Sequence, residues 1–473
     1  MKLILARSLI PAPIRIDVDS FNPITGAVSA TVTMYSTTYA LSEADFNILL
    51  IEEDVNTTPT TYDDTHIARA LFSDTITLTG VGNTAEFNTV FSISPSWNTS
   101  NLRAIAFVQL SDESIIQVGS SDPMPAFKAR AMVPCPRVLF GSSSGVTSSG
   151  DFTIMNLGLT ESFTMEVVVD EAPPGWQFAI TDEVGTVHND PFAFGLANDE
   201  STFFHVDITP DSSGQATFHV EISSPNLARE VVIPFSFFTD DFDVMLVDDD
   251  GDETYEDYFT AALDSAGYSY RVWDRALNEL TADVVEHIQV LVWNAGWSFP
   301  CLDQVDRAFL TEYLDEGRAL FLSGQDIGWE LNDPDGSPDP VWYETTFHAH
   351  YVRDNTGIHS LFGVTGDPVS DGLSLVIEGG TGASNQQYPD QIEAADSDAT
   401  VIFNYQDDGG GAIRAIDSSS HARIVYLGFG FEGIADAQDR LDLLKRSVEW
   451  IGPEVFSDGF ESNSTGAWDV SVP

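Results

Sequence analysis

The chain has 473 residues, which is too long for one ordinary hydrophobic core and favours about three domains. Nineteen basic and 74 acidic residues give a formal net charge of −55. A surface of this charge repels nucleic acid and anionic membranes and attracts divalent cations. No apolar run approaches the ~20 residues of a membrane helix, so we expect a soluble protein with no membrane-spanning segment and no nucleic-acid partner.

The acidic residues are spread along the whole chain rather than gathered in blocks. Adaptation to a saline habitat explains this distribution, and calcium loading in a secreted protein is the alternative. At the N-terminus, Arg7 ends the apolar stretch after four residues, whereas a secretory signal has an apolar region of about 7–15 residues. The rest of the chain is typical of an extracellular or cell-surface protein, so we expect that the chain lacks its true beginning.

The only two cysteines, Cys135 and Cys301, fall in different predicted domains and form no Cys-x-x-Cys pattern. The sequence therefore predicts neither a redox motif nor a zinc site. A disulfide between the two thiols stays open at this point.

The first predicted domain, residues 1–133, is a β-sandwich. Short segments with period-two alternation, or rich in apolar and β-branched residues, are separated by Gly, Asn, Pro and Ser clusters. The domain resembles the β-sandwich that follows a thioredoxin domain in a family of bacterial outer-membrane lipoproteins. The resemblance is carried by Leu-Leu-Ile-Glu-Glu-Asp at 49–54, His-Ile-Ala-Arg-Ala-Leu at 66–71 and the stretch from Trp97 to Gln109. The thioredoxin portion is absent here, so the resemblance implies no thiol–disulfide activity.

The second predicted domain, residues 134–240, is another antiparallel sandwich. Strand-like segments at 163–169, 203–208 and 216–222 surround a Pro-Pro-Gly-Trp turn. The pattern resembles the immunoglobulin-like spacer modules of secreted bacterial enzymes.

From residue 241 to 452 the pattern changes to alternating strands and helices. Apolar strands at 244–247, 290–293 and 319–323 alternate with helical segments, and a helix at 437–451 closes the domain. This alternation predicts a doubly wound parallel sheet covered on both faces. The segment from about 333 to 421 is expected to be an insertion of loops and short strands, and residues 453–473 form a polar tail. The whole chain is thus predicted as a multidomain β and α/β protein.

Polar residues follow several of the predicted parallel strands. Because the carboxyl ends of parallel strands meet at one edge of the sheet, we expect these residues to gather there and to bind a ligand. The expected ligand-binding residues are Asn294, Gln325, Asp326 and Glu432.

The first of these strands runs directly into an acidic segment. Asp248, Asp249, Asp250 and Asp252 are the candidate metal ligands. Clustered carboxylates must bind protons, pair with a cation or stay solvated, and Ca²⁺ prefers oxygen ligands. An EF-hand is excluded because Glu253 stands where that loop needs glycine. Ca²⁺ in another loop geometry is the candidate cofactor.

The segment Gly-Gln-Asp-Ile-Gly at 324–328 has the glycine spacing of a nucleophile elbow, with Asp326 at its centre. An aspartate nucleophile needs a histidine to activate water, and His348 and His350 are the candidates. The alternative is a tight turn in which Asp326 starts a helix. The sequence leaves both open.

The α/β domain resembles the flavodoxin-like, class I glutamine amidotransferase-like domains of secreted bacterial peptidases and surface proteins. The carrying stretches are Val-Asp-Asp-Asp-Gly at 247–251, Leu-Ser-Gly-Gln-Asp at 322–326, Gly-Val-Thr-Gly-Asp-Pro at 363–368 and Tyr-Leu-Gly-Phe-Gly-Phe-Glu at 426–432. Amidotransferases of this fold place cysteine in the elbow, where this chain has Asp326. The resemblance therefore implies the fold, with a degenerate or repurposed site.

Together these features predict a secreted or cell-surface, non-catalytic binding or scaffold protein. Its expected partner is a surface glycan, a peptide or a cell-envelope component. The alternative is a secreted hydrolase, peptidase-like or amidotransferase-like, with an Asp/His site in the α/β domain.

If the acidic surface is an adaptation to salt, the melting temperature should rise as molar KCl screens the repulsion between carboxylates. Thermal unfolding of the full chain, followed by circular dichroism across a KCl series, measures this dependence. A melting temperature that does not change with KCl would contradict salt adaptation.

Overall fold

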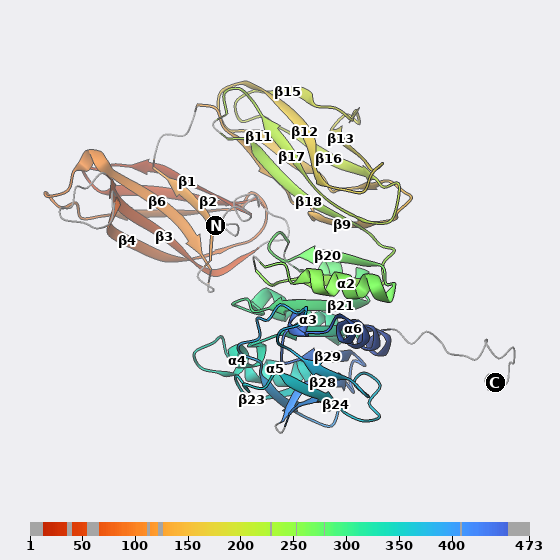
Figure 1. The fold of residues 1–473 in the computed structure, drawn as a ribbon. Helices are drawn as coiled ribbons and strands as arrows, with labels where there is room; N and C mark the ends of the chain where they lie inside the picture. The colour runs from red at the N-terminus through yellow and green to blue at the C-terminus, as the bar shows by residue number, and fades with distance from the viewer. Residues whose placement is uncertain are drawn as a thin grey trace, which may run out of the picture. The chain divides into compact units, whose positions relative to one another are not determined.

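The structure, a computed structural model, describes residues 13–35, 40–53, 66–110, 114–121, 126–227, 229–251, 253–278, 280–406 and 409–452. Residues 1–12, Asp252 and the predicted tail at 453–473 lie outside the described residues. The chain divides into two compact units, one ending at Thr239 and the next beginning at Asp240. The first unit consists of β-sheets, and the second combines a large sheet with helices (Figure 1).

The first part of the first unit has two antiparallel sheets around one core. Its elements are β1 (Ile14–Phe21), β2 (Ala27–Met34), β3 (Leu41–Glu53), β4 (His66–Leu78), β5 (Thr84–Val90), η1 (Thr99–Asn101), β6 (Leu102–Gln109) and β7 (Ile115–Ser120). One sheet has the order β1-β2-β5 and the other β4-β3-β6-β7. Along β2 and β6 every second residue is buried, as the period-two pattern predicted. Phe46 of β3 stacks on Phe87 of β5, with ring centroids 3.8 Å apart, and joins the two sheets.

The second part of the first unit is also a sandwich. Its strands are β8 (Ala129–Met132), β9 (Val138–Gly141), β10 (Thr147–Ser148), β11 (Phe152–Asn156), β12 (Glu161–Glu171), β13 (Gln177–Asp182), β14 (Val187–His188), β15 (Phe192–Leu196), β16 (Ser201–Thr209), β17 (Gln215–Ser223) and β18 (Val231–Thr239). The sheet orders are β14-β13-β16-β11-β8, with β10 beside β16, and β15-β12-β17-β18-β9. Every pair is antiparallel except β18 with β9. Phe152 of β11 contacts Phe235 of β18 across the core. The β-sandwich prediction is confirmed.

The second unit is built on a nine-stranded sheet. Its elements are β19 (Val244–Asp248), α2 (Glu256–Ala266), β20 (Tyr270–Asp274), η2 (Ala282–His287), β21 (Val290–Gly296), α3 (Gln304–Asp315), β22 (Ala319–Gly324), α4 (Ile327–Asn332), α5 (Pro340–Phe347), β23 (Ala349–Arg353), β24 (Ser360–Gly363), β25 (Ser374–Val376), β26 (Gln391–Ala394), β27 (Ala399–Tyr405), β28 (Gly410–Ile416), β29 (Arg423–Leu427), η3 (Phe431–Gly433) and α6 (Ala437–Ile451). The sheet order is β20-β19-β21-β22-β29-β28-β27-β24-β25, and β23 pairs with β26 apart from it.

Helices cover both faces of this sheet. On one face, α2 and α6 pack on the core that contains Phe259, Leu443 and Val292. On the other face, Phe309 of α3 contacts Trp293 of β21. On this second face, Phe347 of α5 also packs against Tyr426 of β29. Because both faces are covered, the parallel strands are apolar at nearly every position, as in β19 and β22.

The sheet is mixed: five strands pair in parallel as expected, and four more strands extend the sheet with antiparallel pairs. The pairs from β20 through β19, β21 and β22 to β29 are parallel. Beyond β29, the strands β28, β27, β24 and β25 pair antiparallel. These strands come from the segment at 333–421 that the sequence predicted as an insertion. The segment extends the sheet instead, because its strands carry apolar residues that close the same core.

Within the described residues, the helices are all too short or too polar to span a bilayer. Both cysteine thiols are free in the structure, Cys301 being fully buried and Cys135 partly buried.

Replacing Phe46 with Ala should destabilise the first unit by about 3–5 kcal/mol, because a fully buried ring is lost and a cavity remains. Urea unfolding of the full chain measures the change in free energy. Val90→Ala on β5 is the matched control, since Val90 is 71% exposed and its loss should change stability by no more than about 0.5 kcal/mol. Equal decreases in the free energy of unfolding of the two variants would contradict this packing.

Candidate functional site

Acidic and amide side chains gather at the carboxyl ends of the parallel strands. Asp248, Asp250 and Glu256 each present a carboxylate oxygen, and these three oxygens lie within 4.8 Å of one another. Asn294, at the end of β21, donates from Nδ2 to Asp250 Oδ2 at 3.0 Å. Glu432, in η3 after β29, lies close enough for the charge of Asp250 to raise its pKa. We call these five residues the strand-end cluster.

Asp250 is the most constrained member of the strand-end cluster. It is only 4% exposed. Its Oδ2 accepts a second hydrogen bond from the Tyr255 backbone N–H at 2.8 Å, just before α2 begins. Gly296 makes room for it: a Cβ at this position would lie 2.7 Å from the Asp250 Cβ. Only glycine permits this approach between β21 and the segment after β19.

Four oxygens of this cluster are buried without a hydrogen-bond partner: Asp250 Oδ1, Glu256 Oε2, Asn294 Oδ1 and Glu432 Oε2. All four are acceptors when the carboxyl groups are ionised. A buried acceptor without a donor costs about 1–3 kcal/mol, and more if it is charged. The strand-end cluster therefore has an excess of acceptors, which protons or a cation can balance.

Burial and mutual repulsion shift the acidity of these groups. Burial and the negative charges of Asp250 and Glu256 raise the pKa of Asp248 to about 8. Burial also raises the pKa of Asp250, although hydrogen bonds from Tyr255 and Asn294 oppose the rise. Burial raises the pKa of Glu432 to about 7, against the hydrogen bond from Asn385. At neutral pH the cluster thus holds protons that a divalent cation would displace.

Asp249 does not join the strand-end cluster, although the sequence grouped it with Asp248 and Asp250. Successive side chains at the end of a strand point to opposite faces of the sheet. Asp249 Oδ2 accepts a hydrogen bond from Trp293 Nε1 at 3.1 Å. Burial and the charge of Asp306 raise its pKa, and Arg275 opposes the rise. Alternation places Asp249 on the face that α3 covers.

Gln325 reaches the strand-end cluster only through a loop. Its Oε1 accepts hydrogen bonds from the backbone N–H groups of Gln387 and Tyr388, and its Nε2 donates to the Asn385 carbonyl. The Asn385 side chain in turn donates to Glu432 Oε1 at 2.7 Å. Gln325 therefore positions the loop whose Asn385 donates a hydrogen bond to Glu432.

Asp326 lies away from the strand-end cluster, in a second carboxylate group with Asp354 and Asp390. It has the left-handed backbone conformation, with φ 66°, directly after β22. Its side chain does not cap α4. Instead, Asp326 Oδ2 accepts a hydrogen bond from Trp297 Nε1 at 2.8 Å. Asp326 thus stands in a tight turn at the start of α4, as the alternative to the nucleophile elbow predicted, but Trp297 rather than the helix binds its carboxylate.

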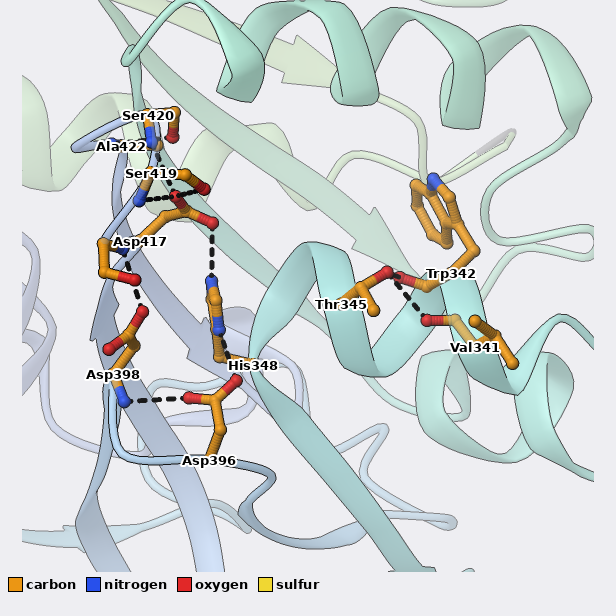
Figure 2. A network of polar contacts seen from close by, with 11 residues as sticks. Val341, Trp342, Thr345, His348, Asp396, Asp398, Asp417, Ser419, Ser420 and Ala422 are labelled. Atoms are coloured by element: carbon orange, nitrogen blue, oxygen red, sulfur yellow. Dashed lines mark hydrogen bonds and ion pairs between the residues drawn. The ribbon is translucent and has the colours of Figure 1, made fainter.

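His348 lies in a different network, at the amino end of β29 (Figure 2). Figure 2 shows its ring between two carboxylates: Nδ1 is 2.8 Å from Asp396 Oδ2, and Nε2 is 3.2 Å from Asp417 Oδ2. Burial opposes ionisation of Asp417, but hydrogen bonds from Ser419 and Ser420 lower its pKa. This network ties the end of α5 to the turns before β27 and β29.

The histidines proposed to act with Asp326 do not lie beside it. His348 is at the opposite edge of the parallel strands, and His350 on β23 pairs with Glu344 at the surface. Tyr351 is the next residue on β23. Burial and the charge of Asp390 raise its pKa, so the Tyr351 side chain is the one that lies near this carboxylate. Period-two alternation along β23 thus directs His350 away from the carboxylates. The Asp/His hydrolase arrangement is not assembled among the described residues.

Sequence reasoning missed Glu256, Asn385, Asp354 and Asp390. Glu256 is the first residue of α2, where an acidic residue is ordinary. Asn385, Asp354 and Asp390 lie in the segment that was predicted to be loops and short strands. The signal that was available for Glu256 was its position in the sequence, four residues after Asp252 and at the start of the helical segment that follows the acidic strand end.

No protein-family model matches the chain, and no curated protein matches it. Among solved structures, it is similar to the PapD-like domain 7 of human CEP192, at 12% identity over 25% of this chain and 87% of that chain, with a TM-score of 0.16. It is also similar to a conjugative transposon lipoprotein from Bacteroides eggerthii, at 15% identity over 24% of this chain and 98% of that chain, with a TM-score of 0.18. A third similarity is to the CARDB domain of the PF1109 protein from Pyrococcus furiosus, at 14% identity over 24% of this chain and 88% of that chain, with a TM-score of 0.16.

The raised pKa values of these carboxyl groups predict how the stability of the protein depends on pH when EDTA keeps it free of metal ions. The pKa is about 8 for Asp248 and about 7 for Asp326 and Glu432, against about 4 in an unfolded chain. The folded state therefore binds more protons between about pH 4 and pH 8, and the free energy of unfolding should fall as pH rises through this window. Each group contributes at most about 1.4 kcal/mol per pH unit.

Urea unfolding of the full chain at several pH values measures the dependence. Asp248→Asn should flatten the decline, and Glu312→Gln, at an exposed position on α3, should leave it unchanged. A decline in Asp248→Asn that is as steep as in the parent would show that Asp248 is not the titrating group.

Proposed function

We propose that this protein is a secreted or cell-surface binding protein whose α/β domain binds Ca²⁺ at the strand-end cluster. Asp248, Asp250 and Glu256 supply the carboxylate ligands, and Asn294 and Glu432 supply further oxygens. Asp252, a ligand candidate from the sequence, lies outside the described residues. Ca²⁺ is bound by six to eight oxygens from carboxylates, amides and water, which matches this set of donors.

The observation that carries the proposal is the set of four buried oxygens without a hydrogen-bond donor. Protonation can also neutralise the carboxyl groups, but each added proton bonds one oxygen and is donated to one neighbour. A single divalent cation contacts several acceptors at once. In a chain with a net charge of −55, it also relieves the repulsion between the carboxylates.

The rest of the architecture is compatible with a binding role. In the parallel part of the sheet the strand order β20-β19-β21-β22-β29 is the flavodoxin-like order 2-1-3-4-5, in which ligands bind at the carboxyl ends of the strands. The two sandwiches precede this domain, as spacer modules do in the secreted proteins that the sequence resembles. A partner at the cell surface would contact the domain through the bound ion.

Returning Ca²⁺ to EDTA-treated full-length protein should raise its melting temperature. At a hundredfold excess over the dissociation constant, the stabilisation is about 2.7 kcal/mol, or on the order of 5–10 °C for a domain of this size. Asp250→Asn should abolish the shift, because the amide keeps an acceptor for the Tyr255 N–H but removes a charged ligand. Differential scanning calorimetry measures both.

Asp257→Asn is the matched control. Asp257 follows Glu256 in α2 and is exposed, so its variant should keep the full Ca²⁺ shift. A parent protein that shows no difference between EDTA and Ca²⁺ would refute the proposed function.

A further inference from the structure

A second group of three carboxylates lies on the same half of the α/β domain, built from segments far apart in the chain. Asp326 follows β22, Asp354 follows β23, and Asp390 precedes β26. Pairing of Arg353 with Gln391 in the small β23–β26 sheet brings Asp354 and Asp390 together. One oxygen from each of the three carboxylates lies within 4.8 Å of the others. We call this group the Asp326 cluster.

Asp390 is held in place by the start of α4. It is completely buried. Its Oδ2 accepts hydrogen bonds from the backbone N–H groups of Gly328, at 2.7 Å, and Trp329, at 3.3 Å. Asp390 thereby performs the capping role that Asp326, the residue adjacent to the helix, does not. Gly328 permits the contact, since a Cβ there would lie 2.8 Å from Asp390 Oδ2.

With one oxygen fixed by the helix, the other oxygen of Asp390 has no hydrogen-bond partner. The same is true of Asp354 Oδ1. Asp326 is only 5% exposed, and its backbone adopts the uncommon left-handed conformation while Trp297 orients its carboxylate. Three carboxylates are thus directed toward one point, with two unsatisfied oxygens among them.

The charges that act on these groups favour a positively charged occupant. Burial, and then the charges of Asp354 and Glu330, raise the pKa of Asp326 to about 7 against the hydrogen bond from Trp297. Burial, and then the charge of Asp326, raise the pKa of Asp390 well above its usual range. The grouping of the three carboxylates and their two oxygens without a donor is the geometry that a bound cation would satisfy. Asp354, which is only half-buried, connects the cluster to solvent.

We propose that the Asp326 cluster is a second divalent-cation site, separate from the strand-end cluster, with Asp326, Asp354 and Asp390 as its carboxylate ligands. The ion is a hard, oxygen-preferring cation of the Ca²⁺ class. Bound there, it would link the turn after β22 and the start of α4 to the β23–β26 sheet. The site would also hold Trp297 and its neighbour Tyr388, whose rings lie 5.4 Å apart, beside the ion.

Terbium(III) luminescence on the metal-free full chain tests this site directly, because Trp297 donates a hydrogen bond to a proposed ligand and would sensitise a bound Tb³⁺ ion. Tb³⁺ is titrated with excitation of tryptophan, and bound Tb³⁺ is counted separately by equilibrium dialysis. Asp390→Asn should weaken Tb³⁺ binding at this site by at least about tenfold and lower the bound stoichiometry by one. Added Ca²⁺ should displace the emission from the parent.

Two variants separate the site from its surroundings. Trp297→Phe should reduce the emission without changing the stoichiometry. Asp335→Asn, at an exposed position after α4, should change neither. If Asp390→Asn does not fold, Asp354→Asn at the half-buried ligand takes its place with the same expected losses.

Unchanged stoichiometry and emission in Asp390→Asn would overturn the second site, and the three carboxyl groups would then be sharing protons. Loss of all Tb³⁺ binding in Asp250→Asn would also overturn it, while leaving the proposed function intact. Loss of binding in Asp390→Asn but not in Asp250→Asn would support the second site and contradict the proposed function. The two proposals therefore fail under different results.

Discussion

The α/β domain depends on how it accommodates carboxylates that folding removes from water. Moving an ionised carboxylate into a protein interior costs several kcal/mol unless hydrogen bonds or an opposite charge compensate. Asp250 and Asp390 meet this cost in part with backbone N–H groups at the start of a helix, and each retains one oxygen without a donor. A fold that only needed to be stable would place apolar side chains at these positions. The unsatisfied acceptors are the observation on which both proposed cation sites rest.

The two carboxylate clusters share one construction. In each, acidic residues follow a strand of the parallel sheet, and a backbone N–H group at the start of the next helix binds one oxygen of a carboxylate. After β19 the helix is α2 and the carboxylate is Asp250; after β22 the helix is α4 and the carboxylate is Asp390, which comes from a distant loop. The helix end fixes one carboxylate oxygen, and the geometry leaves the second directed toward its neighbours.

Sequence reasoning succeeded where local periodicity decides the structure. The alternation at β2 and β6, the apolar runs at β19 and β22, and the final helix α6 were all predictable, because side-chain period and apolar content follow directly from burial on one face or two. It failed at β24, β25, β27 and β28; β24 and β25 have only four and three residues, and segments that contain glycine and aspartate separate the four strands. Their place in the sheet is set by the pairing of β28 with β29 and of the other three strands beyond β28, which local sequence does not encode.

From the sequence alone, the acidic charge, the order of sandwich and α/β domains and the presence of carboxylates after the parallel strands were determined, since each depends on composition or on neighbouring residues. The tertiary structure decided which carboxylates meet. Strand alternation separated Asp249 from Asp248 and Asp250, and β23–β26 pairing brought Asp354 and Asp390 to Asp326. His348 was directed to the opposite edge of the sheet. These outcomes depend on contacts between residues tens of positions apart, and only the folded chain specifies them.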